Sequence, residues 1–189
     1  MNTLKQVALA VITASALAAP VAQAATISFA GYATGGTGLS SLTIGIATFA
    51  ITGGTVFAYA PGAFGAFPTS GGLCALSNGC QTDWTLTLSS AVKDFSFFAD
   101  FYNPIDTVQV TAFNGATQVG SLTVGANGAY SFGSTVITRL VFDDSSTGAG
   151  FGFGDFSYNL ATAVPAPATL ALVGLGLLAV GATRRRRAA

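Results

Sequence analysis

The sequence predicts an all-β fold, in which a single jelly-roll-like β-sandwich lies between two targeting segments. Residues 25–163 show apolar side chains at alternate positions and no convincing helical periodicity. Dipeptides that favour tight turns separate these runs. The chain also holds 15 Phe and one Trp, which is enough apolar mass for one core. We therefore divide the 189 residues into segments 1–24, 25–163 and 164–189.

Charge is scarce in this sequence and unevenly distributed. Charged residues make up 7% of the chain, and neither His nor Glu is present. Their absence excludes Ser-His-Asp triads and His metal sites. Segment 25–163 contains two basic residues, Lys93 and Arg139, against seven Asp, so its net charge is −5. A mildly acidic body argues against nucleic acid as a partner.

The first 24 residues have the pattern of a secretory signal peptide, which would form an N-terminal signal helix. Lys5 supplies the basic start, and Val7–Ala19 is apolar. Ala22 and Ala24 are the small residues that precede a cleavage site, so we predict cleavage before Ala25 and export by the Sec machinery. The alternative is an uncleaved membrane helix, for which this apolar run is short.

Alternating runs in the body predict about nine or ten strands with short connections. Asn114-Gly115 predicts a hairpin between two of these runs. The apolar phase changes near Gly154-Asp155, which predicts a β-bulge, and alternate Gly residues there leave one strand face bare. The longer runs are 41–52, 55–60, 84–89, 95–101, 107–113, 118–124, 136–142 and 151–160, and a shorter one with Tyr130 and Phe132 follows Asn127-Gly128.

The longest irregular segment, residues 61–82, contains both cysteines. Cys74 and Cys80 are six residues apart, and an exported protein meets an oxidising compartment. We predict a disulfide between them, worth roughly 2 kcal/mol for so small a loop. Two metal-binding thiols are the alternative, but no further Cys or His completes a closed site. Phe64 and Phe67 of this segment are expected to be exposed.

The C-terminal segment has three consecutive parts. A proline motif precedes an apolar stretch, residues 168–183, and a basic cluster follows. As a helix the stretch would reach about 24 Å, short of the ~30 Å hydrocarbon core. The basic cluster is expected to stay in the cytoplasm, with the body outside. The proline motif is Val164, Pro165, Ala166 and Pro167, and the cluster is Arg184, Arg185, Arg186 and Arg187.

The order and spacing of these three parts resemble the PEP-CTERM sorting signal. The resemblance implies that an exosortase removes the tail at the proline motif after transient contact with the inner membrane. It further implies a Gram-negative host with an exopolysaccharide matrix, and a product at the cell surface or outside the cell. One departure is Ala166, where the family usually has Glu. A plain single-pass tail anchor is the simpler alternative.

The body resembles, more loosely, other small β-domains found between a signal peptide and such a tail. The resemblance lies in the Phe-rich run 95–102, the hairpin run 108–124, the run 137–142 and the closing run 152–158. This pattern is similar to that of carbohydrate-binding-module jelly rolls. The resemblance implies a sugar ligand for the body.

Candidate polar sites are few. Asp143, Asp144 and Asp155 are a weak calcium candidate, and a solvated turn accounts for the first two equally well. Asp94 and Asp100 lie about 20 Å apart on one strand face, too far for the paired carboxylates of a glycosidase. We therefore predict no cofactor and no catalytic residues.

Aromatic residues are the remaining candidates for contact with a sugar, together with neighbouring polar residues. The main hypothesis is an exported surface or matrix protein with a structural or interaction role in the exopolysaccharide envelope. The alternatives are a carbohydrate-binding module and, weaker still, an Asp-based glycan-active enzyme. The candidate contact residues are Tyr32, Tyr59, Tyr102, Tyr130 and Tyr158, with Asn103 and Asp106.

Overall fold

The computed structural model describes residues 24–76, 80, 83–101, 106–144 and 150–161. These residues form antiparallel strands and one 3-10 turn, which confirms the predicted all-β class. The predicted signal helix and membrane helix lie outside the described residues. Within those residues, no helix is long and apolar enough to span a bilayer.

The strands are named here in chain order. They are β1 (Ala24–Thr26), β2 (Gly35–Gly36), β3 (Ser41–Ile44), β4 (Ala47–Ile51), β5 (Thr55–Tyr59), β6 (Gly72–Leu76), β7 (Trp84–Asp100), β8 (Val108–Asn114), β9 (Thr117–Val124), β10 (Gly128–Ser131), β11 (Ile137–Asp144) and β12 (Gly152–Leu160); the 3-10 turn η1 is Ala63–Gly65.

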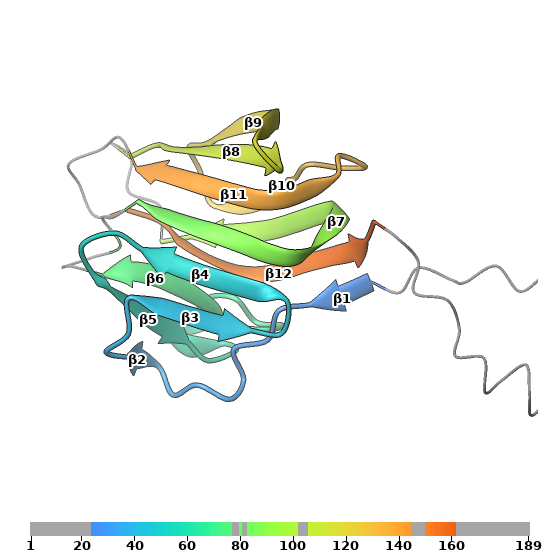
Figure 1. Ribbon diagram of the computed structural model, residues 1–189. Helices are drawn as coiled ribbons and strands as arrows, with labels where there is room; N and C mark the ends of the chain where they lie inside the picture. Colours follow the sequence, from blue (N-terminus) through green and yellow to red (C-terminus); the bar gives the residue numbers. More distant parts are fainter. Residues whose placement is uncertain (1–23, 77–79, 81–82, 102–105, 145–149, 162–189) are drawn as a thin grey trace, which may run out of the picture. The chain divides into compact units, whose positions relative to one another are not determined.

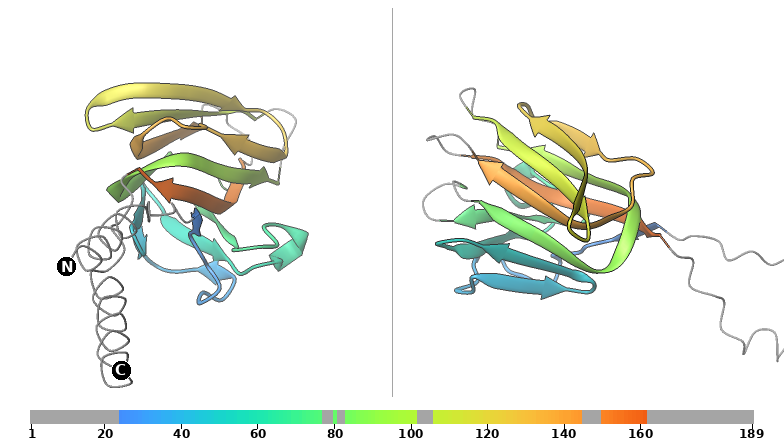
Figure 2. Two further views of the ribbon diagram at one scale, coloured as in Figure 1. Left: turned by 90° about the vertical axis from the view of Figure 1, so that its right-hand side faces the viewer. Right: turned by 45° about the horizontal axis from the view of Figure 1, so that its top comes forward.

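One long strand, β7, belongs to two groups of strands. Its first half pairs with β4 and β11, whereas its second half pairs with β10 and β12. One group therefore runs β3-β4-β7-β11-β8-β9, and the other runs β2-β5-β6-β12-β7-β10. Figure 1 shows β3 and β4 in front of β5 and β6. In the left view of Figure 2, β7 and β12 lie between residues 106–144 and residues 35–76.

The apolar side chains of β7 change phase along the strand. Trp84 and Leu86 are buried in its first half, and Phe95 and Phe97 are buried in its second half. Asp94 lies between them at a φ of 53° and is exposed, so the alternation passes from even to odd positions. Because a one-residue shift turns every side chain to the other face, this irregularity lets both halves face one core. The sequence pattern predicts 84–89 and 95–101 as separate runs, whereas the structure joins them in the single strand β7.

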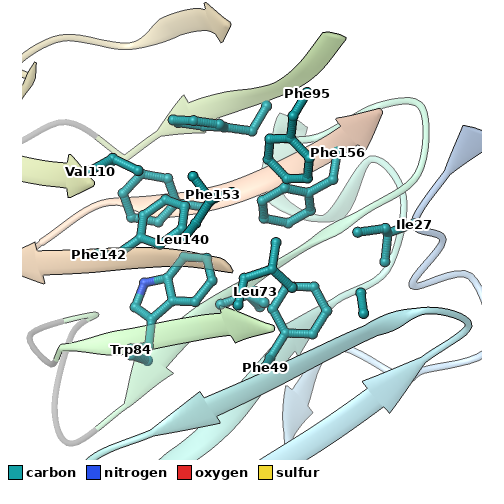
Figure 3. Close-up of a cluster of buried hydrophobic side chains, with 14 of the residues drawn as sticks. Ile27, Phe49, Leu73, Trp84, Phe95, Val110, Leu140, Phe142, Phe153 and Phe156 are labelled. Carbon is teal, nitrogen blue, oxygen red and sulfur yellow. The ribbon is translucent and has the colours of Figure 1, made fainter. Parts of the chain in front are cut away.

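Aromatic rings from both groups of strands meet in the core (Figure 3). The Trp84 ring stacks on Phe142 at 3.7 Å between centroids, with both residues in the first group. Phe153 of β12 lies 4.8 Å from Phe142 and 5.6 Å from Trp84. Phe49 of β4 lies 5.6 Å from Phe156 of β12. These contacts show that the core lies between two facing layers, as in a sandwich.

Two local predictions are confirmed. β8 and β9 form the predicted hairpin, with Asn114 and Thr117 as partners around Gly115, whose φ is 60°. The register of β12 against β7 shifts between Gly154 and Ser157, where the bulge was predicted. The run 41–52, in contrast, is not one strand. It folds into the hairpin β3–β4, because Gly45 takes up a φ of 59° and reverses the chain.

The stacked indole of Trp84 gives a direct test of this core. Trp84→Ala removes contacts with rings from both layers, so we expect a loss of about 3–5 kcal/mol in the free energy of unfolding. Urea unfolding followed by circular dichroism measures this loss. Val119→Ala, at a position 37% exposed, is the control and should change stability by about 0.5 kcal/mol or less. Equal effects of the two variants would contradict this account of the core.

Candidate functional site

A second apolar cluster lies apart from the main core. Along β5, β6 and β7, successive side chains point to opposite faces of the sheet. Val56, Leu73 and Phe97 face the main core, so the strand residues of the second cluster, which are next to them in sequence, lie on the other face. Residues 60–71 connect β5 to β6 and contribute to this cluster. We call its aromatic members, with the neighbouring Phe64, the aromatic cap: Phe57, Tyr59, Phe64, Phe67, Phe98 and Phe101.

Phe67 fixes the loop to the sheet. Its side chain is fully buried, so the prediction that it is exposed is wrong. The backbone φ of 46° turns the ring inward onto three glycines, Gly72, Gly152 and Gly154. A Cβ on Gly154 would lie 2.6 Å from this ring, and a Cβ on Gly152 would lie 2.7 Å from the ring of Phe101. The strand face left bare by alternate glycines is therefore covered by two Phe rings.

The predicted disulfide is present beneath the cap. Cys74 of β6 and Cys80 are bonded, with their Cα atoms 4.9 Å apart, and both are buried. The hydroxyl of Tyr59 lies 4.0 Å from Cys80 Sγ. Burial raises the pKa of Tyr59, so its hydroxyl stays protonated to a higher pH than that of an exposed tyrosine. The disulfide thus joins the cap to the start of the segment that leads into β7.

Asp155 ties the other end of the loop to β12. Its Oδ1 accepts hydrogen bonds from the amides of Ser70 at 2.7 Å and Thr69 at 3.2 Å, and from the Ser70 hydroxyl at 3.2 Å. The amide of Asp155 donates to the Gly71 carbonyl at 3.0 Å. The left-handed φ of 47° at Asp155 belongs to the bulge in β12. This carboxylate, a calcium candidate in the sequence, therefore holds a loop.

Phe64 lies at the tip of the loop and is 78% exposed, as predicted. It occupies η1 with a φ of 54°, a region that costs a non-glycine residue about 1–3 kcal/mol. Its ring meets the buried Tyr59 ring edge-on, at 6.1 Å and 82°. Tyr59 in turn lies 5.2 Å from Phe57 and 5.2 Å from Phe101. The exposed ring thus stands on a packed aromatic base.

The candidate tyrosines that the structure describes pack in or against the two apolar clusters. Tyr59 and Tyr158 are buried, and burial raises the pKa of both. Tyr130 stacks on Phe97 at 5.6 Å, and its hydroxyl donates to the Ala126 carbonyl at 2.9 Å. Tyr32 packs against the main core. Tyr102 and Asn103 lie outside the described residues.

The acidic candidates have separate environments. Asp94 Oδ2 accepts a hydrogen bond from Asn159 Nδ2 at 3.0 Å, and Asp100 Oδ1 accepts one from the Phe101 amide at 2.7 Å. Asp143 is exposed near the end of β11. Among the described residues, no three Asp or Cys side chains form a metal-binding group, so Asp143, Asp144 and Asp155 are not one ligand set.

Most of the predicted targeting residues lie outside the part of the chain that the structure describes. These are Ala22, residues 164–167 and residues 184–187. Ala24 and Ala25 lie in β1, where Ala25 is the partner of Tyr158 in β12. Cleavage before Ala25 therefore falls within the first strand of the body, and Ala25 and Thr26 remain to pair with β12.

Comparison with solved structures finds weak likeness to family 29 carbohydrate-binding modules. A mutant of such a module is 13% identical at a TM-score of 0.33, covering 74% of this chain and 92% of its own. A mutant of the module CBM29-2, from work on ligand recognition, is 11% identical at a TM-score of 0.33, covering 78% and 99%. Likeness at this level carries no argument about function.

Comparison with curated proteins finds no significant match. The pattern of one known family, the PEP-CTERM protein-sorting motif, matches residues 163–187. This match covers the proline motif, the apolar stretch and the basic cluster in the order expected from the sequence. The chain is therefore a protein with a PEP-CTERM sorting motif at residues 163–187.

Proposed function

We propose that this chain is a non-enzymatic surface or matrix protein, which an exosortase sorts into the exopolysaccharide envelope of a Gram-negative bacterium. The single observation that carries the proposal is the sorting motif at residues 163–187. The motif implies export and cell-surface sorting. Its match begins two residues after Ala161, the last described residue of the body.

The arrangement of the body supports processing at both ends. β1 and β12 are paired, so the first and last strands of the body stabilise each other. Sec export with cleavage before Ala25 leaves this pairing in place, apart from Ala24. Removal of the tail at Pro165–Pro167 also leaves β12, which ends at Leu160, complete. The mature product is then a jelly-roll-type sandwich that no longer contacts the inner membrane.

The hydrogen bonds that four of the Asp carboxylates accept support a non-enzymatic role. Asp94, Asp100 and Asp155 each accept hydrogen bonds from neighbouring groups that shape the chain. Asp83 Oδ1 accepts one from the amide of Asp144 at 3.1 Å. In a glycosidase, two carboxyl groups must flank the same glycosidic bond. Carboxylates that already hold loops and strand ends by hydrogen bonds do not fit this catalytic role.

Carbohydrate binding is a second candidate, and the exposed ring of Phe64 favours it. The apolar face of a pyranose packs on an aromatic ring, and the Phe64 ring is exposed at the tip of the loop. Phe67 and Asp155 hold the loop in place before any ligand arrives. A ring held rigidly in advance loses little conformational freedom on binding, which favours affinity.

The sorting proposal predicts the mass of the mature protein. In the native host, we expect a species that begins at Ala25, ends within residues 164–168 and contains one disulfide. Intact mass of material from the envelope and the medium, with and without reduction and alkylation, measures this. A Pro165→Ala/Pro167→Ala variant should accumulate uncleaved, whereas Ala171→Val in the apolar stretch should be processed normally. A wild-type species that retains Arg184–Arg187 would show a tail anchor instead.

The carbohydrate candidate predicts that Phe64 carries binding. Affinity electrophoresis in gels that contain purified exopolysaccharide of the host, or a neutral glucan, compares the wild type with two variants. Phe64→Ala should weaken retardation roughly 3- to 10-fold, since one aromatic contact is worth about 0.5–1.5 kcal/mol. Leu39→Ala, at a position 52% exposed, is the matched control and should bind like the wild type. A wild type that no polysaccharide retards would exclude this candidate and leave sorting untouched.

A further inference from the structure

A carboxylate without a partner is buried just before β8. The Asp106 side chain is 1% exposed, and neither of its oxygens has a hydrogen-bond partner. An ionised carboxylate that leaves water without a compensating donor or cation is strongly destabilising. Buried polar groups in native proteins are nearly always paired, so Asp106 needs a compensating group.

The strand pattern directs a second carboxylate toward the same side of the layer. Val108 and Val110 face the core, and Asp106 continues their alternation toward the start of β8. In β11, Phe142 faces the core and Asp144 continues that alternation. Val108 and Asp144 are partners in the register, so Asp106, two residues before β8 begins, and Asp144, the last residue of β11, lie at the same end of this strand pair.

Two oxygens meet beside Gly150 at this end. A Cβ on Gly150 would lie 2.3 Å from the Cys80 carbonyl oxygen and 2.5 Å from Asp144 Oδ2, so only glycine fits here. Both oxygens therefore face the same small space. The disulfide to Cys74 holds Cys80, and the bond from the Asp144 amide to Asp83 Oδ1 holds the end of β11.

Neither basic side chain of the body is placed to neutralise the Asp106 carboxylate. Its two basic residues are Lys93 and Arg139. The Arg139 guanidinium lies 4.0 Å from the Phe113 ring centroid, and its Cα is about 17 Å along β11 from that of Asp144. Lys93 lies in the second half of β7, opposite Asn159. A cation from solution can supply the compensating charge.

We propose that Ca²⁺ binds between the carboxylates of Asp106 and Asp144, with the Cys80 carbonyl oxygen as a further ligand. Ca²⁺ takes six to eight oxygen ligands, including carboxylates, carbonyls and waters, and tolerates irregular geometry. Mg²⁺ requires a stricter octahedron, and both cysteines are committed to the disulfide, which disfavours Zn²⁺. This ligand set differs from the sequence candidate, because Asp143 is exposed and Asp155 holds the loop. It does not depend on the proposed function.

The test uses the full chain, purified in mild detergent and stripped with EDTA. We expect millimolar CaCl₂ to raise the Tm by several degrees, because a ligand that binds only the folded state stabilises it. Equimolar MgCl₂ should raise it much less, and EDTA should reverse the rise. Calorimetric titration with CaCl₂ should give one site per chain. A wild type without a calcium-dependent Tm or measurable calcium binding overturns the proposal.

Variants identify the ligands. Asp106→Asn keeps the shape of the side chain and should abolish the calcium-dependent rise in Tm, and Asp144→Asn should reduce it strongly. Asp143→Asn, at the exposed neighbouring position, is the matched control and should retain the full rise. An Asp106→Asn protein that still responds to calcium would overturn the assignment. If that variant fails to fold, the wild-type titration and Asp144→Asn decide.

Discussion

The fold depends on one strand that serves two layers. β7 pairs with four other strands, and its alternation changes phase at Asp94. Without that change, Phe95 and Phe97 would face away from the core that Trp84 and Leu86 enter. The amide of Asp94 donates to the Gly133 carbonyl at 2.7 Å, which satisfies the backbone at the irregularity. A single irregular position, Asp94, therefore allows β7 to pair with both groups of strands and to pack both of its halves into one core.

The outer face of β12 is covered by aromatic side chains from other segments of the chain. Gly152 and Gly154 leave no side chains on their face of β12, and the rings of Phe67 and Phe101 fill that space. The loop that carries Phe67 is then tied down by Asp155 and lies beside the disulfide. The cost of the left-handed backbone at Phe64 is offset by these fixed neighbours, and the result is an exposed ring on a rigid base.

Because the body has only two basic residues, the hydrogen-bond partners of each Asp show how its charge is compensated. Asp94, Asp100 and Asp155 hold backbone or side-chain donors, so they act in the architecture. Asp106 has no such donor and lies in a body with two basic residues, which is why an external cation is the consistent explanation.

Local patterns were sufficient for the all-β class, the hairpin at Gly115, the bulge near Gly154, the disulfide and the sorting motif. Each depends on residues close together in the chain, where backbone preference and spacing carry the information. Contacts between distant residues were decided by the tertiary structure. Ser70 and Asp155 are 85 residues apart, and nothing local indicates that they meet. Phe67 is likewise buried because glycines from β6 and β12 come together beneath it, which alternation within one segment does not encode.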